Sequence, residues 1–276
     1  MTIAVMIPLE DNFADILGKA QRGSRLSDDQ TARQAGVAAA ELAAVKSGRF
    51  DEAVVRRLAP VLKLDADALV GLGRQAWRPA DPGPMAGLAC FNTPFQDMTV
   101  NSYLVFDPTT KMAAAFDTGA DCDGMLAFAK ERGLKIGQIL LTHIHTDHIF
   151  ELDRLKKITG APAFVSEREP TEGAEPFAHG REFAIGALTV QTRRTSGHSR
   201  GGVTYVVTGL ARGLAVVGDA VFAGSMGGGL VSYDEALKTN RASIFSLPDD
   251  TVICPGHGPL TTVGEEKIHN PFFAGS

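Results

Sequence analysis

The stretch LLTHIHTDHI, residues 140–149, places three histidines and an aspartate within six residues at the end of an apolar run. The apolar residues before the histidines have the pattern of a buried strand, and α/β folds place their sites at the carboxyl ends of such strands. Residues two apart in an extended chain face the same side, so His143 and His145 can point at one ion. Asp147 and His148 begin a predicted helix and can turn toward a second ion. The stretch therefore predicts a metal site.

Three later segments carry histidine or aspartate beside glycine: GHS (197–199), VVGDA (216–220) and PGHGP (255–259). Each follows a predicted strand, so we expect its ligand to reach the same sheet edge. Glycine lets the backbone approach closely and adopt unusual dihedral angles. Imidazole and carboxylate donors without thiolate suit Zn, Fe or Mn. The two other histidines, His179 and His269, lie in polar or Pro-rich loops and are assigned no role.

Length and composition indicate a soluble globular protein of two domains. The chain has 276 residues, of which 44% are hydrophobic and 21% charged. A net charge of -5 does not favour nucleic acid as a partner. The first eleven residues lack the basic region of a secretory signal, and no apolar run approaches membrane-spanning length. Three widely spaced cysteines argue against a disulfide framework. We expect a cytoplasmic protein that makes no membrane contact.

The chain divides at WRPADPGP (77–84), where three prolines forbid a continuing helix. We predict a small all-α domain over residues 1–76, a Pro-rich linker over 77–85 and an α/β domain over 86–276, with Trp77 packing one part on the other. The expected helices of the first part lie near 10–21, 28–35, 38–47, 51–63 and 66–75. In the second part, strands are expected at 102–106, 136–142, 188–191, 203–207 and 214–217, and helices near 121–132, 147–159 and 234–246.

The segments THIHTDH (142–148), GH (197–198), GD (218–219) and PGHG (255–258) resemble the four signature segments of the metallo-β-lactamase superfamily. Within it, the chain is similar to the glyoxalase II-like hydrolases from about residue 86 onward. The resemblance implies an αββα sandwich with a metal site along the shared edge of two sheets. It also implies two divalent metal ions, zinc first, with Fe or Mn as alternatives. The implied ligands are His143, His145 and His198 for one metal, Asp147, His148 and His257 for the second, and Asp219 as the bridge.

Two such metals would lower the pKa of a bridging water from ~15.7 toward ~7 and so supply a hydroxide that attacks a carbonyl. Asp147 can orient this nucleophile as a catalytic residue. Asp117 is a candidate partner for a ligand histidine or a simple turn aspartate. The resemblance favours a small-molecule thioester as substrate. True β-lactamases of the superfamily carry a cysteine where this chain has Asp219, which disfavours antibiotics.

Two departures from the resemblance concern the substrate. GSMGGGL (224–230) stands where relatives have a GRTD-like turn. Glyoxalase II carries a C-terminal helical domain that binds glutathione, whereas only about twenty residues follow His257 here, so we do not expect glutathione specificity. A lactone is an alternative substrate of the same hydroxide attack. A mononuclear iron persulfide dioxygenase is an alternative enzyme, with His143, His198 and Asp219 as its triad.

A DNA-binding regulator is the competing hypothesis from another class. TARQAGVAAAELAAVKSG (31–48) resembles the helix-turn-helix of lambda-repressor-like domains. The solvent-facing positions of its second helix are alanines, which offer nothing to a base edge. Residues 1–80 hold 11 basic and 10 acidic side chains, so this part is nearly neutral. We therefore do not expect nucleic acid to be the partner. We expect the first part to be a helical module that packs on the second, forms a homodimer or covers the active site.

Overall fold

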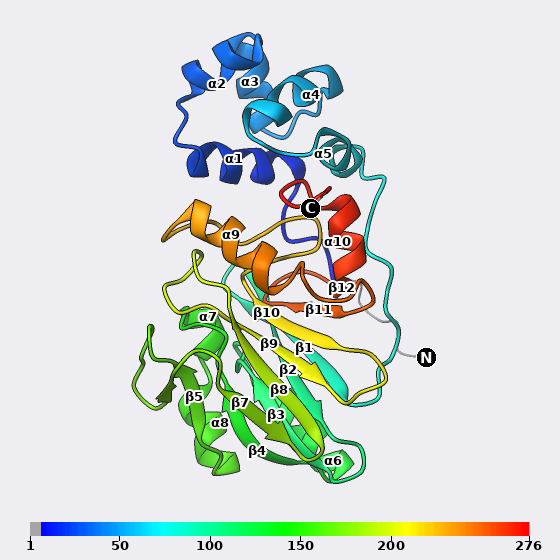
Figure 1. Cartoon of the computed structure of the whole chain (residues 1–276), viewed down its shortest axis with the longest axis vertical. Coiled ribbons are helices and arrows are strands. Elements are labelled where there is room, and N and C mark those ends of the chain that lie inside the picture. Colours follow the sequence, from blue (N-terminus) through cyan, green and yellow to red (C-terminus); the bar gives the residue numbers. More distant parts are fainter. Residues whose placement is uncertain (1–6, 276) are drawn as a thin grey trace.

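The structure is a computed structural model that describes residues 7–275. The first six residues, which belong to the stretch predicted to lack a secretory signal, and Ser276 lie outside the described residues. Two sheets stack face to face in the lower part of Figure 1, and helices cover their outer faces. This is the predicted α/β class, an αββα sandwich preceded by a helical region.

Five short helices form the region before the sandwich. They are α1 (Phe13–Gly23), α2 (Asp28–Ala35), α3 (Ala39–Lys46), α4 (Glu52–Val61) and α5 (Ala66–Gly73). Side chains at their starts accept hydrogen bonds from the first-turn amides, which otherwise lack partners. Asn12, Ser27, Asp51 and Asp65 do so at the starts of α1, α2, α4 and α5. Between α2 and α3 the chain turns at Gly36 in the left-handed conformation.

The first sheet has the strand order β1-β2-β3-β4-β5-β6. Its strands are β1 (Leu88–Phe95), β2 (Met98–Phe106), β3 (Met112–Phe116), β4 (Lys135–Leu140), β5 (Ala163–Ser166) and β6 (Glu175–Phe177). The pairs from β3 to β6 are parallel, so β3, β4 and β5 end at the same edge. Helices α6 (Asp123–Arg132), α7 (Thr146–Ile149) and α8 (Leu152–Thr159) follow strands of this sheet.

The single helix predicted over residues 147–159 is wrong, because the chain forms α7 and α8 with a break between them. The carbonyl oxygen of His148 accepts hydrogen bonds from Thr118 N at 2.8 Å and Thr118 Oγ1 at 3.0 Å. A carbonyl has two lone pairs, so this oxygen cannot also accept the helical bond from Leu152 N. The tertiary contact ends the first helix one turn after it begins.

The second sheet has the order β12-β11-β10-β9-β8-β7. Its strands are β7 (Glu182–Ile185), β8 (Leu188–Arg194), β9 (Val203–Thr208), β10 (Leu214–Gly218), β11 (Val252–Pro255) and β12 (Thr261–Thr262). Helices α9 (Tyr233–Ser243) and α10 (Val263–His269) lie between this sheet and the helical region (Figure 1). In β7 and β8 buried and exposed residues alternate, whereas β10 and β11 are buried throughout. Both faces of the central strands are therefore covered.

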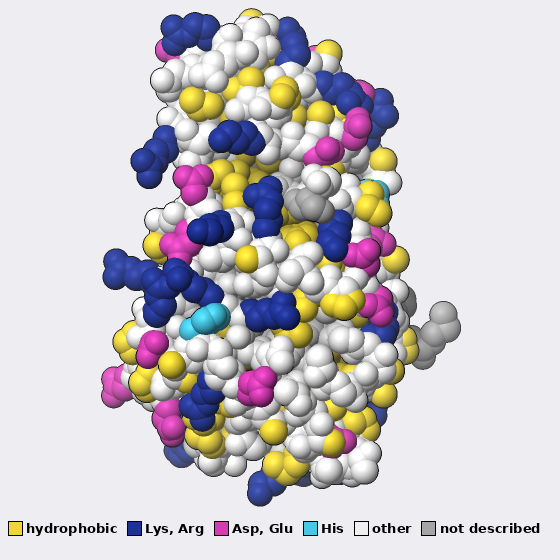
Figure 2. Space-filling model, in the orientation of Figure 1, with side chains coloured by type: hydrophobic (Ala, Val, Ile, Leu, Met, Phe, Trp, Pro, Cys, Tyr) yellow, Lys and Arg dark blue, Asp and Glu magenta, His cyan; other side chains and the backbone are white. Residues whose placement is uncertain are grey.

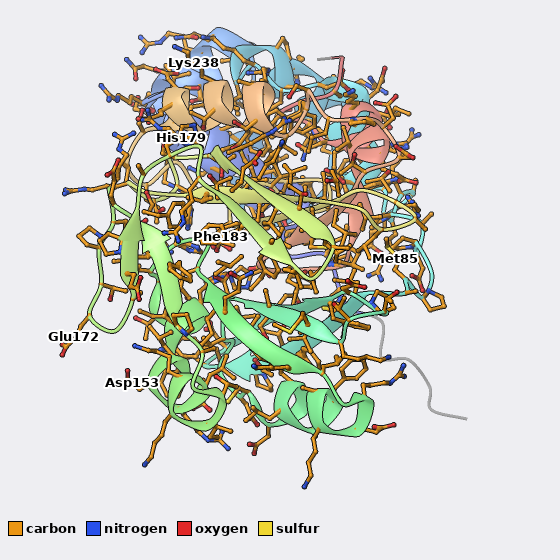
Figure 3. All side chains as sticks on the ribbon, turned by 60° about the horizontal axis from the view of Figure 1, so that its bottom comes forward. Met85, Asp153, Glu172, His179, Phe183 and Lys238 are labelled. Carbon is orange, nitrogen blue, oxygen red and sulfur yellow. The ribbon has the colours of Figure 1, made fainter. Side chains whose placement is uncertain are left out.

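Three apolar clusters hold these layers together. One fills the space between the sheets and includes Phe116, Tyr205 and Phe183, the last labelled in Figure 3. A second joins the first sheet to α6 and α8. The third runs without interruption from α1–α5 through β10 and β11 to Phe273. Burial of apolar area is the main favourable term in folding, so the helical region and the second sheet stabilise each other.

The segment between α5 and β1 carries the predicted linker. Trp77 packs the two parts together as predicted, because its ring stacks on His269 at 4.8 Å and its Nε1 donates to Glu265 Oε2 at 2.9 Å. The division into domains 1–76 and 86–276 stays a prediction. Among the described residues, none of the helices is long and apolar enough to cross a membrane.

Candidate metal centre

The candidate centre lies at the edge where strands of both sheets end. His143, His145, Asp147 and His148 follow β4 in the first sheet, while His198, Asp219 and His257 follow β8, β10 and β11 in the second. The structure thus brings all seven predicted residues together. They form two groups, each with its possible ligand atoms within 4.8 Å of one another. The first group is His143, His145, His198 and Asp219; the second is Asp147, His148 and His257.

The first group is built around the imidazole of His198. Its Nε2 lies 3.0 Å from His145 Nδ1 and 3.3 Å from Asp219 Oδ2. His143 Nε2 approaches the same carboxylate oxygen at 3.9 Å. His143 and His145 reach one point because residues two apart in an extended chain face the same side. Three ring nitrogens and one carboxylate oxygen are a donor set that suits Zn, Fe or Mn.

The second group lies on the other side of Asp219. His148 Nε2 is 3.2 Å from Asp219 Oδ1, and His257 Nε2 is 3.5 Å from Asp219 Oδ2. Asp147 Oδ2 lies 3.3 Å from His257 Nε2 and 3.5 Å from His148 Nε2. The carboxylate of Asp219 is therefore in contact with both groups, which is the position that the bridging role requires.

Several buried polar atoms at this edge of the sandwich have no hydrogen-bond partner and are suited to binding a cation. His143 Nε2, His148 Nε2 and Asp219 Oδ1 are buried and make no hydrogen bond within residues 7–275. A buried polar atom without a partner costs free energy, and an ion coordinated by these atoms removes that cost. The residues present thus fit the divalent metals that the donor chemistry implies.

The Nδ1 atoms of two of the histidines form hydrogen bonds with groups outside the two clusters. Nδ1 of His198 lies 2.9 Å from Gly228 O, and Nδ1 of His257 lies 2.7 Å from Thr99 O. A carbonyl only accepts, so each Nδ1 carries the proton. The Nε2 lone pair of each ring is then free for a metal. Such outer hydrogen bonds fix the tautomer and the orientation of metal ligands.

The charges of the centre also match a cation. Burial and the neighbouring imidazole of His148 lower the pKa of His143 well below its usual value. Burial opposes ionisation of Asp219, yet the imidazoles of His148 and His257 hold its pKa well below the ordinary range. Burial lowers the pKa of His257, but the same carboxylate raises it to about 11, so a metal that binds this ring would take the place of the Nε2 proton. The buried charge of Asp219 requires compensation, which the imidazolium proton or a divalent ion would provide.

Asp117 lies behind the centre, where the sequence suggested a partner for a ligand histidine. Its Oδ2 contacts His148 Nδ1 at 2.8 Å and accepts from Thr142 Oγ1 at 2.7 Å, while its Oδ1 accepts from Thr142 N at 2.7 Å. The backbone of Asp117 has a φ of 54°. Non-glycine residues rarely adopt this conformation, and aspartate tolerates it better than most. The turn therefore aims one carboxylate at both the strand end and the ligand ring.

Sequence reasoning missed the residues that hold the turn bearing His257. Asn101 on β2 donates through Nδ2 to Pro255 O at 3.0 Å and to Gly258 O at 2.8 Å, and Tyr103 donates through its hydroxyl to Pro255 O at 2.6 Å. Both side chains are buried. The available signal was an asparagine and a tyrosine within a strand whose other residues are mostly apolar. The two histidines without a predicted role lie elsewhere: His269 stacks on Trp77, and His179 is exposed before β7 (Figure 3).

Comparison with known proteins identifies the class. Residues 96–257, more than half of the chain, match the sequence profile of the family described as Metallo-beta-lactamase superfamily. The chain belongs to this superfamily and is one of its metallo-hydrolases.

Relatives and solved structures agree with this assignment. A protein of Bacillus subtilis described as probable metallo-hydrolase YqgX is 29% identical over 66% of this chain and 96% of its own length. The crystal structure of BLEG-1 B3 metallo-beta-lactamase is 28% identical, with a TM-score of 0.58 over 68% of this chain and 100% of that one. The structure of TTHA1623 in a di-iron-bound form is 26% identical, with a TM-score of 0.53 over 66% of this chain and 99% of that one.

Proposed function

We propose that the chain is a binuclear metal-dependent hydrolase of a thioester, resembling glyoxalase II in its chemistry. The observation that carries the proposal is the carboxylate of Asp219 between two groups of ligand atoms, several of which are buried and without hydrogen bonds. One metal would be held by His143, His145, His198 and Asp219, and the second by Asp147, His148, His257 and Asp219. The likeness to a di-iron protein supports two metals.

The chemistry divides between the metals and the chain. Two divalent ions, zinc first and Fe or Mn as alternatives, would when bound supply a hydroxide at neutral pH and a positive charge for the oxyanion. Asp147 is half-buried, and burial opposes its ionisation, yet the contacts with His257 and His148 lower its pKa. It is therefore ionised at neutral pH and can accept a hydrogen bond from the nucleophile. This ionised carboxylate supports Asp147 as the residue that would orient the attack.

A cavity of about 420 Å³ beside the centre is where a substrate can lie. His145 and Asp147 of the centre line it together with the apolar side chains of Phe95, Met98 and Ile144. Among the described residues that line it, none is Lys or Arg. An apolar wall beside an electrophilic centre suits an uncharged acyl group, whereas a glutathione carboxylate or a phosphate finds no cation there.

The test is elemental analysis of the purified protein together with a substrate panel. We expect two metal ions per chain and hydrolysis of acyl thioesters, more rapidly for those with apolar acyl groups. Lactones belong in the panel because the same attack opens them, and β-lactams because a similar structure is a β-lactamase. If the protein binds two metals and hydrolyses a lactone or a β-lactam but no thioester, the thioester substrate is wrong and the assignment as a binuclear hydrolase stands.

A second candidate is a mononuclear iron persulfide dioxygenase. The first group contains the two histidines and one carboxylate that such a site needs, His143, His198 and Asp219. Oxygen consumption with glutathione persulfide and one iron per chain would establish this function and overturn the hydrolase.

A third candidate, from another class, is DNA binding through the helical region. The helices α2 and α3 with the turn at Gly36 have the order of a helix-turn-helix. Ala39, Ala40 and Ala43 are exposed on α3 and have no group that reads a base. On the face in Figure 2, basic and acidic side chains of the helical region are interspersed. We infer a packing or dimerising module, and binding of random duplex at low salt in a gel shift would contradict this inference.

A further inference from the structure

The helical region reaches the candidate centre through the loop that follows Asp219. This loop, residues 222–228, contains glycine at 224, 227 and 228. We propose that Asp11 and Lys19, which lie outside the segment that matches the superfamily, are positioning residues that hold this loop and through it two metal ligands. The inference rests on the proposed role of His198 and Asp219 as ligands.

The loop contacts both ligands directly. Gly227 N donates to the carbonyl oxygen of Asp219 at 3.1 Å, and Gly228 O accepts from His198 Nδ1 at 2.9 Å. A Cβ atom on Gly227 would lie 2.0 Å from the carbonyl oxygen of Asp219 and 2.8 Å from His198 Nδ1. The backbone is therefore packed directly against the centre, and only glycine fits at residue 227. A shift of the loop would move the partner that orients the ring of His198.

Lys19 on α1 and Asp11, just before this helix, form hydrogen bonds with the same loop. Ser225 Oγ donates to Asp11 Oδ2 at 2.5 Å, and Lys19 Nζ donates to Met226 O at 2.9 Å. Asp11 and Lys19 also form an ion pair with each other, in which their side chains are only 9% and 15% exposed. The two paired residues thus form hydrogen bonds with two consecutive residues of the loop.

A second contact links Lys19 to the other side of the centre. Its ammonium group lies 5.2 Å from the centre of the Phe222 ring, and that ring meets the ring of His257 edge-on at 5.6 Å. Nearby, a Cβ atom on Gly258 would lie 3.3 Å from Glu10 N. The N-terminal segment therefore packs beside the turn of His257 as well as against the loop.

The composition of the loop explains why an outside support is needed. Glycine loses more conformational freedom on ordering than any other residue, so a loop with three glycines does not hold one shape by itself. A charge-assisted hydrogen bond is stronger than a neutral one, and here both members of an ion pair bind the loop. The consequence is a centre whose His198 side is ordered from a helix about 200 residues earlier in the chain.

The test compares metal affinity in four variants of the full chain. Lys19→Met removes the ammonium and keeps the length, Ser225→Ala removes one loop contact and leaves the ion pair, and Lys19→Arg restores the charge. Lys46→Met is the matched control, because Lys46 pairs with Asp28 on the helical region away from the loop. Zinc affinity is measured by competition with a chelator, alongside thermal unfolding of the metal-free proteins, kcat and KM.

We expect Lys19→Met to weaken zinc binding about tenfold, the low end for loss of an outer partner of a metal ligand. Ser225→Ala should weaken it less, Lys19→Arg should restore most of it, and Lys46→Met should match the wild type. If Lys19→Met does not fold, Ser225→Ala against Lys46→Met carries the test. Lower thermal stability with zinc affinity within twofold of the wild type would overturn the inference. A wild-type protein that binds no metal would instead reject the proposed function.

Discussion

The two sides of the candidate centre are held in different ways. On the side of the first sheet, His143 and His148 follow β4 and are fixed by Thr142 and Asp117, which lie at neighbouring strand ends. On the side of the second sheet, His198 depends on the carbonyl of Gly228, in a glycine-rich loop that α1 and α10 hold. The first side is organised within the superfamily segment. The second also relies on parts of the chain outside it.

The largest effect is expected where the two sides meet. Replacing Asp219 with Asn keeps the shape but removes the negative charge that faces both groups of ligands, so neither metal is fully neutralised. We expect activity to fall by at least about two orders of magnitude, because a buried charged interaction of several kcal/mol is lost, and metal content to fall with it. Activity and elemental analysis measure this. Asp153→Asn is the control, since Asp153 is exposed on the first turn of α8 (Figure 3). Full metal content in Asp219→Asn would show that the two sides bind independently.

The next effect concerns the first side alone. Asp117→Asn preserves a residue that tolerates the left-handed backbone but removes the charge against His148 Nδ1. Loss of such an outer partner typically costs 10–100-fold in metal affinity or activity. Chelator competition should therefore give a larger loss than Lys19→Met gives on the opposite side. Equal losses would remove the contrast between the two sides.

The last effect concerns stability rather than metal binding, and it is a pH dependence on the second side. Glu266 on α10 is buried, and its carboxylate accepts hydrogen bonds from Gly224 N, Asn270 Nδ2 and Thr261 Oγ1. Burial raises its pKa from 4.5 to about 7. Between these values Glu266 binds more protons in the folded than in the unfolded state, so its contribution to the free energy of unfolding falls as pH rises from 4.5 to 7 and is constant above.

The glutamine side chain of Glu266→Gln is neutral at every pH, so this variant should not lose stability in this way as the pH rises. Its stability relative to the wild type is expected to rise between pH 5 and pH 8, by at most about 3 kcal/mol at 1.36 kcal/mol per pKa unit. Urea denaturation of both proteins at the two pH values measures the difference, and the titration of all other groups cancels in it. A constant difference between the proteins would show that Glu266 is ionised in both states.

The sequence predicted the ligands better than their supports. The HxHxDH pattern and the three glycine-flanked segments placed seven side chains at strand ends, and the structure brings all seven to one edge. The partners Thr99 O and Gly228 O are backbone atoms, which any residue supplies, so no residue type marks them. The contact of Lys19 with Met226 joins residues 207 apart, and local patterns carry no information about it.

The same limit applies to the fold. Helices with clear caps, such as α2 after Ser27 and α5 after Asp65, were predicted to within a few residues. The strands β1, β3, β5, β6, β7 and β12 were missed. β3 is rich in alanine, and β5, β6, β7 and β12 have four residues or fewer, so these runs lack a recognisable period. β1 contains Pro94, which argues against a strand in the sequence. The break after α7 could not be predicted, since it depends on Thr118 binding the carbonyl of His148 across the sheet edge.

The apolar cluster that runs from α1–α5 into β10 and β11 makes the chain cooperative. Leu58 and Val70 in the helices belong to the same continuous interior as Ile253 and Phe273 in the sandwich. A polypeptide shortened to begin after Trp77 would open that interior to water and would tend to self-associate. Calorimetry of the intact protein should accordingly record one melting event for both parts.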